Sequence, residues 1–110
     1  MEISVKEMGN VGVIKLEGRL DAHSAKKVKD TITGQVKAKL INLVVDMGAI
    51  KFMDSSGLGT LVASLNSVRR AKGQLKIASI HDQVRAIFEL TRLHLVFEIF
   101  DDVQTAVNSF

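Results

Sequence analysis

The residues with the clearest chemical potential lie between positions 54 and 60, which read Asp54-Ser55-Ser56-Gly57-Leu58-Gly59-Thr60. They follow the apolar run 40–45 and precede a segment with helical spacing, so we expect them at a turn from a strand into a helix. At such a turn the first backbone N–H groups of the helix are free and the helix dipole is positive. The serine hydroxyls therefore lie where a phosphate can be bound or attached covalently.

The same run does not match the common catalytic or nucleotide-binding loops. A nucleophile elbow has Gly two positions before its Ser, but Met53 stands there before Ser55. The run also lacks the Lys of a phosphate-binding loop, and Val62 stands where a dinucleotide fingerprint has its third Gly. We therefore do not expect an enzyme.

Several of these residues also have purely structural interpretations. Asp54 and the two serines suit a helix N-cap, and on spacing alone capping explains them as well as a phosphorylation site does. Gly57 and Gly59 lower helix propensity by about 1 kcal/mol each relative to Ala. Either close approach of another molecule to the backbone or close packing of the helix on a sheet would explain that cost. Phe52 and Met53 are expected in core or rim packing.

Composition favours one compact domain spanning residues 1–110. The chain is 46% hydrophobic and 25% charged, with no Pro and no Cys, which excludes a disulfide-stabilised fold. No apolar stretch approaches the roughly 18 residues of a membrane span, and no signal peptide is visible. We expect a cytoplasmic protein with no membrane partner. His23, His81 and His94 lack metal-ligand spacing, so surface or capping roles are expected and no metal or cofactor is predicted.

The net charge of +3 raises the question of an anionic partner. Five lysines fall on one predicted helix, and three cations end the next: Lys26, Lys27, Lys29, Lys37, Lys39, then Arg69, Arg70 and Lys72. The chain has no Trp or Tyr on which bases could stack. We interpret the lysines as solvated helix faces and expect no direct nucleic-acid partner.

Apolar periodicity predicts the elements that position the serine turn. The expected order is β-β-α-β-α-β-α-β-α, which gives an α/β fold with a small mixed sheet of four to five strands and about four helices. Strands are expected over 3–6, 11–17, 40–47, 75–77 or 75–79, and 96–100. Helices are expected over 24–39, 58–72, 82–91 and 103–110. Gly73 is expected at the C′ position of the second helix, Asp82 as the N-cap of the third, and Asp101 or Asp102 as that of the last.

Two strand-to-helix turns are expected at the carboxyl edge of this sheet. The first is Gly18-Arg19-Leu20-Asp21 and the second is the serine turn. Ligand and partner sites of such sheets lie at that edge, so both turns can converge there. On its own Asp21 suits a turn or an N-cap.

With these two motifs, Gly18-Arg19-Leu20-Asp21 and Phe52-Met53-Asp54-Ser55-Ser56-Gly57-Leu58-Gly59, the whole chain resembles the STAS domain, in particular the single-domain bacterial anti-sigma factor antagonists. The second motif carries the likeness, because phosphorylatable members share nearly the whole string and this chain does not depart from it. By motif position, Ser55 corresponds to the phosphorylated Ser. Asp21 corresponds to the family's Asp near the phosphorylation site.

The resemblance implies a switch between partners. The unphosphorylated form would bind an anti-sigma factor and release the sigma factor. The anti-sigma factor, a serine kinase using ATP, would phosphorylate Ser55, and a PP2C-type phosphatase would reverse this. The predicted partner-binding residues are Asp21, His23, Ser24, Met53, Asp54, Ser56, Gly57, Leu58 and Gly59. The alternative is a constitutive binding or scaffold subunit of a lipid-transport or stress-sensing assembly, with the serines only capping; the intact Asp54-Ser55 pair favours the switch.

Overall fold

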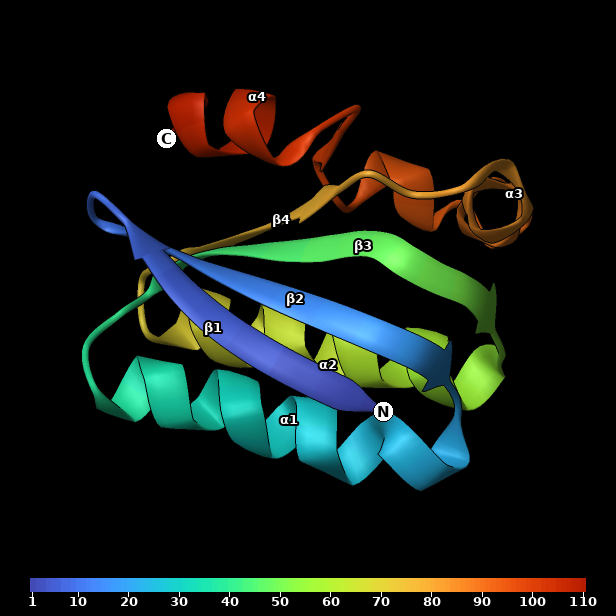
Figure 1. Ribbon diagram of the computed structural model, residues 1–110, viewed down its shortest axis with the longest axis horizontal. Helices are drawn as coiled ribbons and strands as arrows, with labels where there is room; N and C mark the ends of the chain where they lie inside the picture. The colour runs from blue at the N-terminus through green and yellow to red at the C-terminus, as the bar shows by residue number, and fades with distance from the viewer.

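A computed structural model describes residues 1–110 as a five-stranded mixed sheet in the order β1-β2-β3-β4-β5, with four α-helices (Figure 1). The elements are β1 Glu2–Met8, β2 Val11–Leu20, α1 Ala22–Lys37, β3 Asn42–Met53, α2 Ser55–Arg70, β4 Gln74–Ala78, α3 Asp82–Leu90, the 3₁₀ turn η1 Leu93–Leu95, β5 Ile99–Phe100 and α4 Val103–Asn108. The predicted α/β class and element order are confirmed.

The sheet combines one hairpin with parallel crossovers. β1 and β2 are antiparallel across a turn at Gly9, whose φ of 63° suits glycine. β2, β3, β4 and β5 are mutually parallel. Helices α1 and α2 lie side by side on one face of the sheet, and α4 lies over the other (Figure 1). Because β2 and β3 are parallel, α1 and α2 both begin at the carboxyl edge of the sheet.

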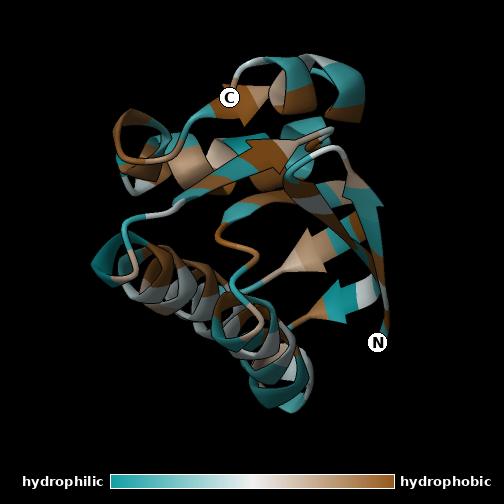
Figure 2. Cartoon of the chain, turned by 90° about the vertical axis from the view of Figure 1, so that its left-hand side faces the viewer, coloured by the Kyte–Doolittle hydropathy of each residue, from teal (hydrophilic) through white to brown (hydrophobic).

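Apolar side chains fill both sides of the central strands. The main cluster joins the sheet to α1, α2 and α3, and a smaller one lies under α4 around Val44 and Ala106. Figure 2 shows the central strands, rich in hydrophobic residues, between the two long helices and the C-terminal helix. The helix stripes agree with the predicted periodicity, for example Leu58, Leu61, Leu65 and Val68 on α2.

Three strands are longer than the sequence predicts, the first being β1, which spans Glu2–Met8. β2 continues to Leu20 through register shifts between Lys15 and Glu17 and between Gly18 and Arg19. β3 continues to Met53, past Gly48 and Ala49, two residues that are depleted in strands. Pairing between the extended halves of β2 and β3 holds them together, so a loss of hydrophobic pattern does not end either strand.

Two predicted helix boundaries and one predicted strand are wrong in detail. α2 ends in a Schellman motif with Lys72, not Gly73, in the left-handed C′ conformation (φ 66°). A Cβ at position 73 would lie 2.0 Å from the carbonyl oxygen of Ile41, so close packing requires that glycine. His81 rather than Asp82 occupies the N-cap position of α3. The last strand is only Ile99–Phe100, because the N–H groups of Val96 and Phe97 donate to the Leu93 carbonyl oxygen and so continue the turn of η1.

The N-cap of α4 agrees with the sequence prediction. Asp102 accepts a hydrogen bond from the Thr105 backbone N–H at 2.7 Å. This donor, followed by the Thr105 side chain, lowers the pKa of the Asp102 carboxyl. The helix is short, and Ala106 is its one fully buried residue.

Candidate functional site

The ends of β2 and β3 bring the two sequence motifs together. Leu20 and Met53 are register partners and the last residues of their strands. The Asp54 N–H donates to the carbonyl oxygen of Leu20 at 3.3 Å. Asp21 and Asp54 therefore follow directly at the same edge of the sheet, each as the N-cap of a helix. The two motifs meet at the edge where they were expected to converge.

Asp54 caps α2 and so relieves the serines of that role. Its carboxylate oxygen accepts a hydrogen bond from the Gly57 N–H at 3.0 Å. Ser55 and Ser56 are the first two helical residues, and both are exposed. The positive end of the helix dipole lies at these positions. A phosphate on Ser55 would thus be close to free N–H groups and to the Asp54 carboxylate.

The two glycines of the motif differ in their surroundings. A Cβ at Gly57 would lie 2.2 Å from the carbonyl oxygen of Leu20, so only glycine lets α2 begin this close to β2. Gly59 is exposed, and a Cβ there would meet no atom within 4 Å. Packing inside the protein therefore explains why position 57 is glycine. It does not explain why position 59 is glycine.

Asp21 forms a capping box at the start of α1. Its carboxylate accepts from the N–H groups of His23 at 3.0 Å and Ser24 at 3.3 Å, while the Ser24 hydroxyl accepts from the Asp21 N–H at 3.0 Å. Partial burial raises the pKa of the Asp21 carboxyl, but the two N–H donors and the positive charges of His23 and Arg19 lower it, and the net result is a lowered pKa. Asp21 therefore carries its negative charge at neutral pH.

An arginine and a phenylalanine stack beside these caps, a pair that the sequence alone did not predict. The Arg19 guanidinium lies 3.8 Å from the centre of the Phe52 ring, and its Nε lies 3.6 Å from an Asp21 carboxylate oxygen. Arg19 and Phe52 are register partners on β2 and β3. Phe52 is 38% exposed, so it lies on the rim and not in the core. The only sequence signal was that each residue belongs to one of the two motifs.

The structure divides the predicted partner-binding residues into two groups. His23, Ser56 and Gly59 are exposed, and Asp21 and Asp54 are half-buried. Ser24, Met53, Gly57 and Leu58 are buried. The four buried residues offer no side chain to solvent. They hold the start of each helix against the strand ends and so position the exposed residues.

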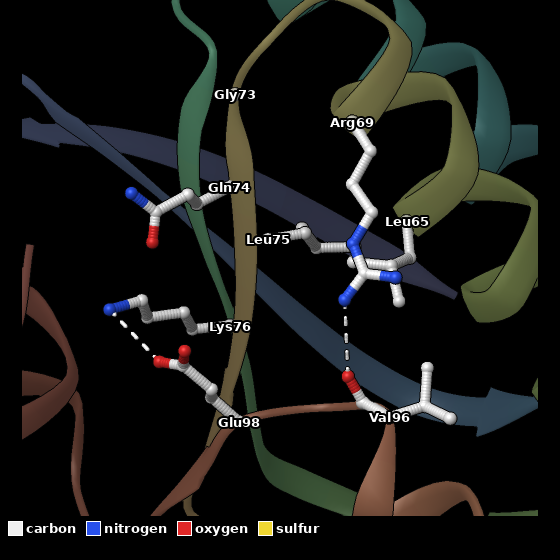
Figure 3. Close-up of a pocket in the computed structure, with 8 residues that line it drawn as sticks. All are labelled: Leu65, Arg69, Gly73, Gln74, Leu75, Lys76, Val96 and Glu98. Atoms are coloured by element: carbon white, nitrogen blue, oxygen red, sulfur yellow. Dashed lines mark hydrogen bonds and ion pairs between the residues drawn. The ribbon is translucent and has the colours of Figure 1, made fainter.

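A separate cleft lies between α2, β4 and the segment before β5 (Figure 3). It has a volume of about 110 Å³, and its charged side chains have partners within the protein. The Lys76 Nζ lies 3.1 Å from a Glu98 carboxylate oxygen, and Arg69 donates to the Val96 carbonyl at 3.3 Å. These contacts join the β5 segment to the rest of the fold.

None of the α-helices has the length and apolar character needed to cross a bilayer.

Comparison with known sequences places this architecture in a family. The family model described as the STAS domain matches residues 2–106. The chain belongs to the STAS domain family. This STAS protein is 31% identical over 100 residues to the anti-sigma-B factor antagonist of Listeria monocytogenes serovar 1/2a, an alignment that covers 90% of this chain and 86% of the relative.

Solved structures agree with the STAS fold. An anti-sigma factor antagonist from Mycobacterium paratuberculosis superposes with a TM-score of 0.88 at 23% identity, covering 98% of this chain and 92% of that one. The Bacillus cell fate determinant SpoIIAA in its phosphorylated form superposes with a TM-score of 0.76 at 18% identity, covering 98% of each chain. At these identities the likeness establishes the fold.

Proposed function

We propose that this STAS protein is an anti-sigma factor antagonist that acts in the cytoplasm and is switched by phosphorylation of Ser55. In its unphosphorylated form it binds an anti-sigma factor that is also a serine kinase, and the sigma factor is released. The kinase transfers the γ-phosphoryl group of ATP to the Ser55 oxygen, which loses its proton, and ADP leaves. A PP2C-type phosphatase hydrolyses the phosphoserine and restores the binding form.

The observation that carries this proposal is the position of Ser55. It is exposed at the first residue of α2, and Asp54 performs the capping that would otherwise explain a serine there. The names of the relatives support the antagonist role, since the Listeria protein is an anti-sigma-B factor antagonist and that of Paenibacillus polymyxa an anti-sigma F factor antagonist. SpoIIAA, which shares the fold, is known in a phosphorylated form.

The local electrostatics explain why phosphorylation would change binding without unfolding the protein. A phosphate adds about −1.5 to −2 charge, and an exposed helix N-terminus stabilises an anion by roughly 0.3–1 kcal/mol. The new charge would join the Asp54 and Asp21 carboxylates at the same edge. A partner that fits the neutral serine would then have to desolvate this concentrated negative charge, so its affinity falls.

Mass spectrometry after incubation with ATP and the candidate anti-sigma factor kinases of the host tests the proposal. We expect one phosphate on Ser55 of the wild-type protein and on the Ser56→Ala variant, and none on Ser55→Ala. The Ser55→Ala variant should still fold and bind the kinase, which leaves the sigma factor active. Phosphate on Ser56 of the Ser55→Ala variant at the wild-type rate would reject the assignment.

The alternative of a constitutive binding or scaffold subunit predicts a different result. In that case no kinase would modify Ser55, and the Ser55→Ala variant would behave as the wild type does with every partner. The capping geometry supports the switch, because a serine that only capped the helix would stand where Asp54 stands.

A further inference from the structure

The positive charge of this protein is concentrated in one stretch of chain. Residues 19–39 contain six cations and two carboxylates, so this stretch carries a charge of +4 while the whole chain carries +3. Five of the cations are lysines on α1 or just after it, and the sixth is Arg19. The remainder of the molecule is therefore close to neutral.

Four of these six cations form no ion pair within the chain, whereas Arg19 pairs with Asp21 and Lys26 with Asp30. On α1, Lys26 pairs with Asp30 at 2.6 Å, and its side chain is still 87% exposed. The Lys27 Nζ donates to the Met1 carbonyl oxygen at 2.8 Å, which leaves its charge uncompensated. Lys29 is exposed and forms no ion pair within the chain. The surface of α1 therefore presents several free positive charges to solvent.

Two adjoining depressions connect this basic surface to the edge that carries Ser55. The first is lined by Arg19, Asp21 and Lys27 among others, and the second by Lys26, Lys27 and Asp30. They share His23 and Lys27, so together they form a shallow trough from Asp21 along the first half of α1. The second depression has no hydrophobic lining residue.

We infer that the trough, defined by Arg19, His23, Lys26 and Lys27, guides and orients an acidic surface of the protein partner that docks at Ser55. Exposed charges at the rim of an interface mainly increase the association rate and fix orientation. Because the trough begins at Asp21, an acidic surface held over Lys26 and Lys27 would lie close to the edge that carries Ser55 once docked. The acidic surface of the partner that the cations of α1 attract is thus the same surface that a phosphate on Ser55 would repel. This inference rests on the proposed function for the identity of the docking edge.

The features of the trough favour an acidic protein surface over two other anions. Binding to an anionic membrane by a helix requires apolar side chains that enter the bilayer, and the exposed face of α1 offers lysines, threonine and glycine instead. Recognition of single-stranded nucleic acid uses aromatic stacking, and the trough contains no Phe, Tyr or Trp. Carboxylates on a folded partner require only the cations that are present.

Stopped-flow association with the anti-sigma factor partner at 20–300 mM salt tests the inference. The double variant Lys26→Gln/Lys27→Gln removes two charges from the trough. The double variant Lys6→Gln/Lys15→Gln removes two from the sheet face opposite α1 and is the matched control. We expect the first to associate about threefold to tenfold more slowly at low salt, with a weaker salt dependence and an unchanged dissociation rate. The control should change the association rate less than twofold.

A second measurement needs no natural partner and so separates the two proposals. A glutamate-rich peptide is titrated into the isotope-labelled protein, and amide shifts are followed by NMR. Shifts confined to residues 19–31 support the inference even if the kinase experiment fails. Equal slowing by both double variants, peptide shifts spread over the molecule, or tighter binding of phosphatidylglycerol vesicles or duplex DNA than of the peptide would each overturn it.

Discussion

The carbonyl oxygen of Leu20 lies where a side chain at Gly57 would have to be, 2.2 Å from the position of its Cβ. This contact joins the end of β2 to the first turn of α2 and sets the position of Ser55, two residues before Gly57. It also explains why the two motifs depend on one another although they are far apart in the sequence.

Substitution of the two motif glycines by alanine should have opposite effects. Gly57→Ala forces the start of α2 away from Leu20, and we expect a loss of about 1–3 kcal/mol in the free energy of unfolding. Gly59→Ala meets no neighbour and raises helix propensity, so it should stabilise by up to about 1 kcal/mol. Urea unfolding of both variants measures this. Reduced partner affinity of a stable Gly59→Ala protein would indicate close approach by the partner at that position.

Substitution of two buried serines by alanine should also have different effects on stability. The Ser24 hydroxyl donates to the Arg19 carbonyl at 2.7 Å and accepts from the Asp21 N–H, so Ser24→Ala should cost about 1–3 kcal/mol. Ser64 is buried in α2, and its hydroxyl has no hydrogen-bond partner. Ser64→Ala should therefore be neutral or stabilising by about 1 kcal/mol. Thermal and urea unfolding compare the two; a large loss for Ser64→Ala would contradict the absence of a partner.

Asp21 should contribute to stability only where it is ionised. Its pKa is lowered in the folded state, so its contribution is present above the unfolded value of about 3.9 and is lost as the pH falls through the folded value. Asn also caps helices well, so Asp21→Asn should match the wild type more closely at pH 3 than at pH 7. Unfolding at both pH values measures this. A constant difference across that range would rule out the ionised cap.

The same residue allows a test of partner recognition. If Asp21 lines the docking surface, Asp21→Asn should weaken partner binding strongly, while the melting temperature at pH 7 falls only by the small amount that loss of the ionised cap costs. Asp21→Ala removes the cap as well and should lower both. Calorimetric titration against the partner, run beside thermal melts, separates the roles: a lower melting temperature with unchanged affinity would leave Asp21 a purely structural residue.

Ser55→Asp should mimic the phosphorylated state only in part. One carboxylate supplies less charge and fewer acceptor oxygens than a phosphate. We expect an affinity for the partner between those of the unmodified and the phosphorylated protein, measured by calorimetric titration of all three. Ser56→Asp places the same charge one residue along the helix and serves as control. Wild-type affinity of Ser55→Asp would count against electrostatic exclusion.

Local patterns in the sequence were sufficient for the order of the elements. The helical spacing of apolar residues on α2 and the apolar run at the start of β3 each indicate a buried face. Neither signal depends on residues elsewhere in the chain. Asp21, Asp54 and Asp102 each stand before a helix, where a carboxylate satisfies free N–H groups of the first turn. The family motifs pointed to Ser55, and its exposure at the start of α2 is consistent with that prediction.

Other features depended on contacts between distant residues. Lys76 lies on a strand and would be expected in water, but it is 3% exposed because the C-terminal segment covers it. Its Nζ donates to the Ser109 hydroxyl at 2.8 Å and lies 4.3 Å from the centre of the Phe110 ring. No local pattern in β4 predicts these partners, which follow Lys76 by more than thirty residues in the sequence.

The sequence by itself determined what neighbouring residues decide: the element order, the aspartate N-caps of α1, α2 and α4, and the serine turn. Only the tertiary structure decided which motif residues face solvent and which are buried. The register of β2 against β3 stacks Arg19 on Phe52, places Asp21 beside Asp54 and buries Ser24 and Gly57. Strand register is set by pairing over the whole sheet, and two extra residues in β3 shift it against β2, so it cannot be obtained from periodicity within one strand.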